Sequence, residues 1–126
     1  LLVECGTHGD PQSRLVAQDQ CLRFLEAAGS FDPGDCAALL PGWRLPDAPD
    51  PWILEVTAGV VARDAQVRFE RPFKGLDVIP RAGTVIGFNG DPIETPYDDC
   101  VLIMPSLRQA KAGVTVVRFA RRRRAH

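Results

Sequence analysis

Residues 52–70, WILEVTAGVVARDAQVRFE, decide the fold class of this chain. Apolar and polar side chains alternate along the first half of the segment with a period of two, which is typical of a β-strand. Arg63-Asp64-Ala65 predicts a turn, and residues 67–70 repeat the alternation in a second strand. One predicted face of the first strand carries Trp52, Leu54, Val56, Ala58 and Val60, and the other carries Glu55, Thr57 and Arg63. The segment therefore predicts two strands, the first with an apolar face.

Similar short segments continue to the end of the chain. Strands are predicted at residues 84–88, 93–95, 101–104 and 114–119, with turn sequences between them. Asn89-Gly90-Asp91-Pro92 is one such turn, and it needs no ligand to explain it. Many short strands separated in this way favour a small barrel or sandwich.

A short internal repeat accompanies these strands. Arg81-Ala82-Gly83 precedes the strand at 84–88, and Lys111-Ala112-Gly113 precedes the strand at 114–119. The repeat indicates either a barrel built from two similar halves or a chance similarity of two glycine turns.

The N-terminal 29 residues have a different pattern. Residues 1–4, LLVE, form an apolar run that ends in a charge, which predicts a short buried strand. Ser13 is the predicted N-cap of a helix over residues 14–28, and Gly29 is its predicted end. The predicted buried stripe of this helix is Ala17, Cys21, Phe24, Leu25 and Ala28, with Leu15 and Leu22 at its edge and Asp19 and Arg23 on the exposed side. A strand, a loop and a helix are half of a βαβ unit, so we expect that more sequence precedes residue 1.

Residues 30–51 are rich in proline, which excludes a long helix or a central strand and predicts a linker. Leu39, Leu40 and Trp43 are its expected anchoring points. The predicted organisation is a strand-loop-helix piece over 1–29, a Pro-rich linker over 30–51, a β-barrel-like domain over 52–121 and a basic, solvated tail over 122–126. The expected fold class is α+β, mainly β.

Composition restricts the class of protein further. The chain has 126 residues, of which 45% are hydrophobic and 25% charged, and its formal net charge is −1. These values are typical of a globular protein and favour neither nucleic acid nor a membrane as a partner. The four cysteines include no CxxC pair, so we expect reduced thiols in a cytoplasmic protein. Exposed strand edges around residues 1–3 predict self-association into a homo-oligomer.

Glu4 is the sharpest candidate for a functional residue, because carboxylates at the ends of buried strands often face a site. Beside low-dielectric strand residues, its pKa would rise toward values useful for a general base. The alternative is an ion pair with a basic residue of the sequence expected to precede residue 1. His8 is a weaker candidate that would line the same site or reach solvent as a loop residue. Only His126 accompanies it, so we expect no metal site within this chain.

Two segments of the chain resemble a known family. VECGTHGDP, followed by the helix LVAQDQCLRFLEAAG, resembles the succinylglutamate desuccinylase/aspartoacylase family of the zinc carboxypeptidase superfamily. VIPRAGTVIGFNGDPIETPYDDCVLIMPS and KAGVTVVRF resemble the β domain that follows the catalytic domain in that family. This β domain is similar to the biotinyl/lipoyl-like barrel-sandwich. The resemblance implies that residues 1–29 belong to an α/β zinc-peptidase-like catalytic domain.

The resemblance also implies an activity, a cofactor and a role for Glu4. Family members hydrolyse an amide bond of N-acyl amino acids or similar small amides, and the Glu at this position acts as general base on zinc-bound water. Their zinc ligands, an H-x-x-E pair and a later His, all precede this strand, so zinc is expected in the full-length parent and not in this chain. This chain alone is therefore expected to be inactive. The alternative is a non-catalytic β-barrel that serves as a binding or interaction module.

Overall fold

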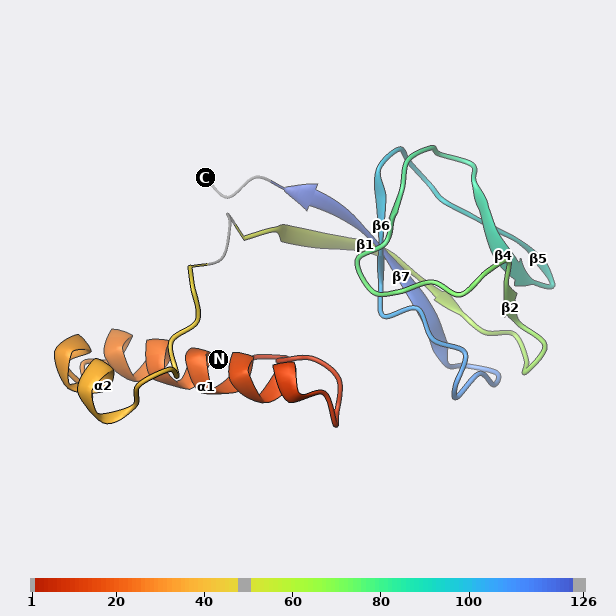
Figure 1. Ribbon diagram of the computed structural model, residues 1–126. Helices are drawn as coiled ribbons and strands as arrows, with labels where there is room; N and C mark the ends of the chain where they lie inside the picture. The colour runs from red at the N-terminus through yellow and green to blue at the C-terminus, as the bar shows by residue number, and fades with distance from the viewer. Residues whose placement is uncertain (1, 48–50, 124–126) are drawn as a thin grey trace. The chain divides into compact units, whose positions relative to one another are not determined.

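The computed structural model describes residues 2–47 and 51–123 and divides the chain into two compact units (Figure 1). Residues 1–49 form one unit, here called the helical unit, and residues 50–126 form the other, the β unit. The helices among the described residues lie in the first unit and the strands in the second. The predicted α+β class with mainly β structure is confirmed at this level. None of the helices in the described ranges has the length and apolar character that crossing a membrane requires.

Helix α1 (Pro11–Ala27) begins earlier than predicted. Asp10 is its N-cap: the Asp10 carboxylate accepts a hydrogen bond from the backbone N–H of Gln12 at 2.9 Å. Pro11 then occupies the first turn, where its missing N–H costs no hydrogen bond. Ser13, the predicted cap, instead donates its hydroxyl to the carbonyl of Thr7 at 2.9 Å. The start was misplaced because Asp-Pro is itself a strong helix-initiation pair.

The end of α1 lies where glycine predicts it. Gly29 has a φ of +70°, and its N–H donates to the carbonyl of Glu26 at 3.0 Å. The N–H of Ser30 donates to the carbonyl of Leu25 at 2.9 Å. These two bonds form the Schellman motif, in which a left-handed residue satisfies the last free carbonyls of a helix.

The predicted strand at residues 1–4 is wrong for the part that the structure describes, residues 2–4, which are irregular. The Leu2 side chain is 84% exposed and Val3 is 42% exposed. A strand needs a neighbour to accept and donate its backbone hydrogen bonds, and no strand of residues 2–47 or 51–123 pairs with this segment.

The segment expected to be a linker contains helix α2 (Pro33–Leu39). The Asp32 carboxylate caps it by accepting a hydrogen bond from the Gly34 N–H at 2.9 Å. Asp-Pro therefore starts this helix as it starts α1. With seven residues α2 is short, so it does not contradict the exclusion of a long helix, but a linker without a helix is not what the described residues form. Of the expected anchoring residues, Leu40 and Trp43 are half-buried and Leu39 is 70% exposed.

The buried side of α1 also differs from the predicted stripe. Cys21 and Phe24 are exposed, whereas Leu22 and the carboxylate-bearing Asp19 are buried. Asp19 is turned inward because it accepts hydrogen bonds from Arg23 Nε at 2.8 Å and from the Leu45 N–H at 2.9 Å. A polar network, which hydrophobic periodicity does not register, therefore selected the buried face.

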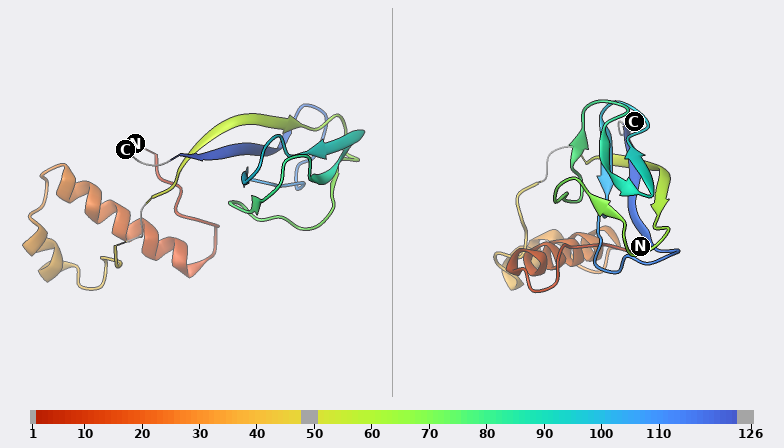
Figure 2. Two further views of the ribbon diagram at one scale, coloured as in Figure 1. Left: turned by 90° about the horizontal axis from the view of Figure 1, so that it is seen from above. Right: turned by 90° about the vertical axis from the view of Figure 1, so that its right-hand side faces the viewer.

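The β unit consists of two antiparallel sheets (Figure 2). One sheet has the order β1 (Ile53–Val61), β7 (Thr115–Arg123), β6 (Cys100–Ile103), β3 (Val78–Ile79). The other has the order β2 (Arg68–Phe69), β4 (Val85–Asn89), β5 (Asp91–Glu94). The predicted strands are present with shifted ends, and β3 is an addition. Two residues are too few for a periodic pattern, and β3 forms because β6 pairs with it.

The core of the β unit is continuous and apolar. Its buried side chains are Ala62, Val67, Ile79, Ile86, Ile93, Cys100, Leu102, Val116, Val117 and Phe119. Strand β1 contributes less than its sequence predicts, because only Leu54 and Val60 of its apolar face are half-buried and Val56 is 51% exposed. A bulge between Val56 and Ala58 shifts the register with β7 and breaks the single buried face.

The predicted basic tail is wrong for Arg122 and Arg123, which continue strand β7. Arg122 pairs with Leu54 and Arg123 with Ile53 of β1. A run of like charges is tolerated here because alternate side chains of a strand point to opposite faces. The remainder of the predicted tail, residues 124–126, lies outside the described residues.

The internal repeat has a structural counterpart in the hydrogen bonds of the β unit. The Gly83 N–H donates to the Thr95 carbonyl at 2.7 Å, and the Thr95 N–H donates to the Thr84 carbonyl at 3.0 Å. Gly113 and Val114 make the same pair of bonds with Ala62, at 3.0 and 2.8 Å. Both glycines have positive φ, +71° and +87°. The agreement favours two similar halves over chance similarity of glycine turns.

Candidate functional site

Two hollows carry the chemically interesting side chains, one in each unit. The first is formed by the N-terminal loop and the start of α1, and it has a volume of about 630 Å³. Glu4 and His8, the two residues singled out from the sequence, both line it. The structure thus places both residues at one hollow.

Glycines give the loop its course. Gly6 has a φ of +125° and Gly9 a φ of +84°, conformations that L side chains rarely adopt. A Cβ on Gly6 would lie 2.5 Å from Ser13 Oγ, so a larger residue would displace the Ser13 hydroxyl as well as strain the backbone. The Asp10 N–H donates to the Thr7 carbonyl at 3.2 Å and closes the turn. These contacts fix the loop against the first turn of α1.

Both candidate side chains are exposed. Within residues 2–47 and 51–123, no hydrogen bond or ion pair engages the Glu4 carboxylate, and no ion pair engages His8. The expected low-dielectric strand end around Glu4 is not formed, because residues 2–4 are irregular and exposed. An unengaged carboxylate can accept a proton from a water or bind a cationic group.

No group of three or more metal-ligating side chains comes together in the described part of the chain. The four cysteines form no disulfide in the described residues. Cys21 on α1 is exposed, whereas Cys36 on α2 and Cys100 on β6 are buried. Burial raises the pKa of the Cys36 thiol and, against an opposing hydrogen bond from Tyr97, that of Cys100. Raised pKa values and burial leave these two thiols protonated and unreactive.

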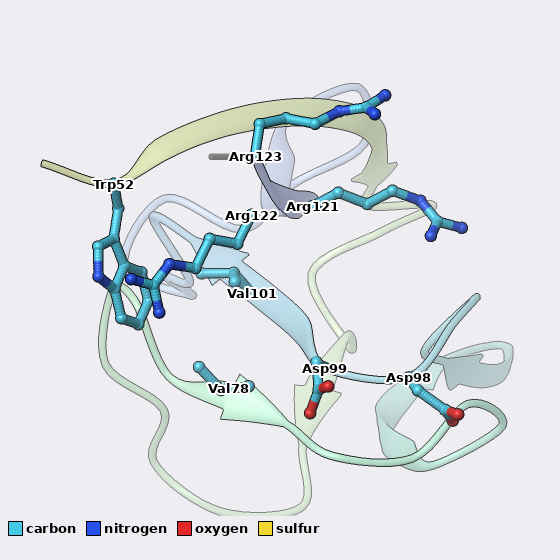
Figure 3. A pocket seen from close by; sticks show the side chains of 8 residues that line it. All are labelled: Trp52, Val78, Asp98, Asp99, Val101, Arg121, Arg122 and Arg123. Atoms are coloured by element: carbon cyan, nitrogen blue, oxygen red, sulfur yellow. The ribbon is translucent and has the colours of Figure 1, made fainter. Parts of the chain in front are cut away.

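The second hollow lies in the β unit and has a volume of about 480 Å³ (Figure 3). It was not predicted. Its lining residues come from the position just before β1, from β3, from the turn before β6, from β6 itself and from the end of β7: Trp52, Val78, Asp98, Asp99, Val101, Arg121, Arg122 and Arg123. Charged side chains of both signs therefore surround an apolar floor.

The three arginines of this hollow have different partners. The Arg122 guanidinium carbon lies 3.8 Å from the centre of the Trp52 ring, and that of Arg121 lies 3.8 Å from the centre of the Tyr97 ring. Arg123 Nε donates to Glu55 at 2.6 Å, and its NH2 group makes a second contact with the same carboxylate. Stacking on aromatic rings and pairing across the strands explain why this run of arginines is ordered as strand.

The two acidic residues also differ. The Asp98 carboxylate accepts a hydrogen bond from the Ala82 N–H at 2.8 Å and thereby holds the turn. Asp99 has a φ of +52°, a conformation that Asp tolerates better than most residues, and no ion pair within the described residues engages it. Asp99 is thus the carboxylate of this hollow that is free to meet a ligand.

A sequence signal for the second hollow existed but was interpreted differently. Arg121–Arg124 reads as a solvated tail because runs of like charge usually are. The strand alternation that begins at Val114 continues through this run, and Trp52 immediately precedes β1, the strand that pairs with it. Which residues meet there depends on the β1–β7 register, which the sequence does not display.

Comparison of the chain with protein-family models, with curated proteins and with solved structures gives no significant match.

Proposed function

We propose that this chain is the C-terminal part of a zinc-dependent hydrolase that cleaves an amide bond of N-acyl amino acids or similar small amides, with Glu4 as the general base. The observation that carries the proposal is the Glu4-Cys5-Gly6 segment, set in a loop against the start of α1 with the Glu4 carboxylate unengaged. It is supported by the likeness of VECGTHGDP and the helix after it to the succinylglutamate desuccinylase/aspartoacylase family.

The described residues do not by themselves fit a zinc site, since no three ligating side chains come together in them. In this proposal the zinc ligands belong to sequence that precedes residue 1. The residues of this chain therefore contribute proton transfer and substrate binding, and not the zinc ligands. Glu4 accepts a proton from the attacking water and delivers it to the leaving amine.

His8 has a secondary role in the proposal. It lines the same hollow as Glu4, on the loop that the helix start holds in place. An imidazole there can donate a hydrogen bond to the carboxylate of an amino acid substrate. His8 thus serves substrate binding and not metal binding.

The experiment joins this chain to the sequence encoded upstream in its gene and measures zinc-dependent hydrolysis of a panel of N-acyl amino acids. Glu4→Gln removes the proton acceptor and keeps the size of the side chain. We expect kcat to fall about 10²–10⁴-fold while bound zinc is unchanged. Glu94→Gln, which changes an exposed carboxylate on β5, is the matched control and should leave kcat unchanged.

Two results would overturn the proposal. One is an extended protein that holds zinc and hydrolyses none of the amides. The other is full activity of Glu4→Gln. In either case the second candidate function, a binding module built on the β unit, becomes the better description, and the charged hollow of that unit is the observation that favours it.

A further inference from the structure

The hollow of the β unit has a charge of each sign on its rim and an apolar floor. Figure 3 shows Trp52 and Arg122 along one side, Asp99 on the other, and Val78 and Val101 between them. Its volume of about 480 Å³ is within the range of small-molecule sites. None of these residues belongs to the Glu4 hollow.

Arg122 offers the hollow a prepared set of hydrogen-bond donors. Its guanidinium lies with one face over the Trp52 ring. Stacking of this kind engages the face of the group and leaves the N–H bonds in its plane free. No carboxylate of the described residues is within ion-pair distance of Arg122. The Arg122 guanidinium can therefore donate two parallel hydrogen bonds to one carboxylate.

The neighbouring arginines do not compete for the same ligand. Arg123 is already paired with Glu55. Arg121 stacks on Tyr97, and because successive side chains of a strand point to opposite faces, it lies on the face of β7 opposite to that of Arg122. In Figure 3 both side chains extend away from the side on which Arg122 meets Trp52. Arg122 is therefore the guanidinium that lies beside Trp52 in the hollow.

On the opposite side of the hollow, Asp99 favours a positively charged group of the ligand. Asp99 has no cationic partner in the described residues, and Asp98 beside it is committed to the Ala82 N–H. Between the two charges, Val101 is buried and Val78 is 42% exposed, so apolar surface faces the space. A ligand with a negative group and no positive group would leave the Asp99 carboxylate without a cationic partner.

We propose that this hollow binds a small zwitterion, an amino acid with an apolar side chain. The carboxylate of the ligand lies on the Arg122 guanidinium, the ammonium group faces Asp99, and the side chain covers Val78 and the edge of Trp52. The proposal concerns binding by the β unit alone and does not depend on the role of Glu4.

The test uses the 126-residue chain and three matched probes in isothermal titration calorimetry: L-leucine, N-acetyl-L-leucine, which lacks the ammonium group, and 3-methylbutylamine, which lacks the carboxylate. We expect leucine to bind at least about tenfold more tightly than either analogue, the effect of one lost charged hydrogen bond. In the chain that carries Trp43→Phe, the fluorescence of Trp52 should change on leucine binding and provide a second readout.

Three variants locate the site. Arg122→Gln and Asp99→Asn should each weaken leucine binding about tenfold or more, while Asp99→Asn should reduce the preference for leucine over N-acetyl-leucine. Arg108→Gln changes an exposed arginine of another loop and should have no effect. Circular dichroism of each variant establishes that the β unit is folded, which is expected because both altered side chains lie at the surface.

The proposal is overturned if leucine gives no heat up to about 10 mM, a concentration at which a millimolar site would be filled. It is also overturned if N-acetyl-leucine binds as tightly as leucine, or if folded Asp99→Asn binds leucine as the unaltered chain does. Binding that survives in folded Arg122→Gln likewise places the ligand elsewhere.

Discussion

The helical unit and the β unit are stabilised by different kinds of contact. In the described part of the helical unit, the buried apolar side chains are Leu22 and Cys36. The remaining buried apolar side chains of the described residues lie in the β unit, where most of them form one cluster. The helical unit instead closes around Asp19, which binds Arg23 and the backbone of Leu45.

This difference shows that the length and composition of the whole chain do not reveal which of its parts contains the hydrophobic core. A unit of fewer than fifty residues can bury only a modest fraction of its apolar surface and depends more on caps and hydrogen bonds. The β unit gains from long-range pairing, in which strands far apart in sequence cover one another. The two units should therefore respond differently to loss of apolar and of polar groups.

The largest effect is expected for Leu102→Ala. Leu102 is fully buried in the β core, so its truncation should lower the free energy of unfolding of the β unit by about 2–5 kcal/mol. Urea unfolding followed by near-ultraviolet circular dichroism measures it. Leu39→Ala, at a 70% exposed position of α2, is the control and should change stability little. Equal effects would mean that the β core is not the principal source of apolar stabilisation.

Asp19→Ala is expected to act on the helical unit. The Leu45 N–H loses its acceptor and Arg23 loses its buried partner, at a cost of about 1–3 kcal/mol. Thermal unfolding followed by the helix signal at 222 nm should report the loss. Asp47→Ala removes the other, 87% exposed partner of Arg23 and should have a much smaller effect. If the two variants were equally stable, the inward position of Asp19 would have no energetic importance.

Acid should weaken the helical unit through the same carboxylate. Burial opposes ionisation of Asp19, but the hydrogen bonds from Arg23 and from the Leu45 N–H outweigh it and hold the pKa of this carboxyl below its ordinary value of 3.8. A group whose pKa is lowered by folding stabilises the fold above the unfolded-state value and loses that contribution as the pH falls through the folded-state value.

The helix melting temperature should therefore fall below about pH 4 in the unaltered chain, and less steeply in Asp19→Asn. Asn keeps an oxygen for the Leu45 N–H but has no charge to titrate, so the difference between the two pH profiles isolates this carboxyl. Parallel profiles would show that other groups cause the acid sensitivity.

The smallest effect is expected for Glu55→Gln in the β unit. The ion pair with Arg123 joins two side chains that are 51% and 61% exposed, and such pairs contribute about 0–1 kcal/mol. Urea unfolding at low and high salt should show a change near the limit of detection. A loss comparable to that of Asp19→Ala would mean that the end of the β1–β7 ribbon depends on this pair more than exposure suggests.

The errors of prediction have a common physical cause. Alternation predicted the strands of the β unit, and Gly29 predicted the end of α1, because these signals act over a few neighbouring residues. The start of α1 at Asp10-Pro11 was local as well, but Ser13 offered a competing cap. The strand expected at the N-terminus and the tail expected at the C-terminus were both wrong because pairing with a distant strand decides them.

The candidate site divides in the same way. Sequence singled out Glu4 and His8, and their shared hollow follows from the short loop between them. The hollow of the β unit could not be found in this way, because Trp52 and Arg122 meet only through the register of β1 with β7.

The sequence by itself therefore determined the α+β class, most of the strands and the glycine turns that begin each half of the repeat, because local backbone preferences and side-chain periodicity specify them. Only the tertiary structure decided which residues line the hollow of the β unit, which face of α1 is buried, and that Arg122 and Arg123 belong to strand β7. These features depend on contacts between residues tens of positions apart. Such contacts produce no periodic pattern of apolar and polar residues in either of the two segments that they join.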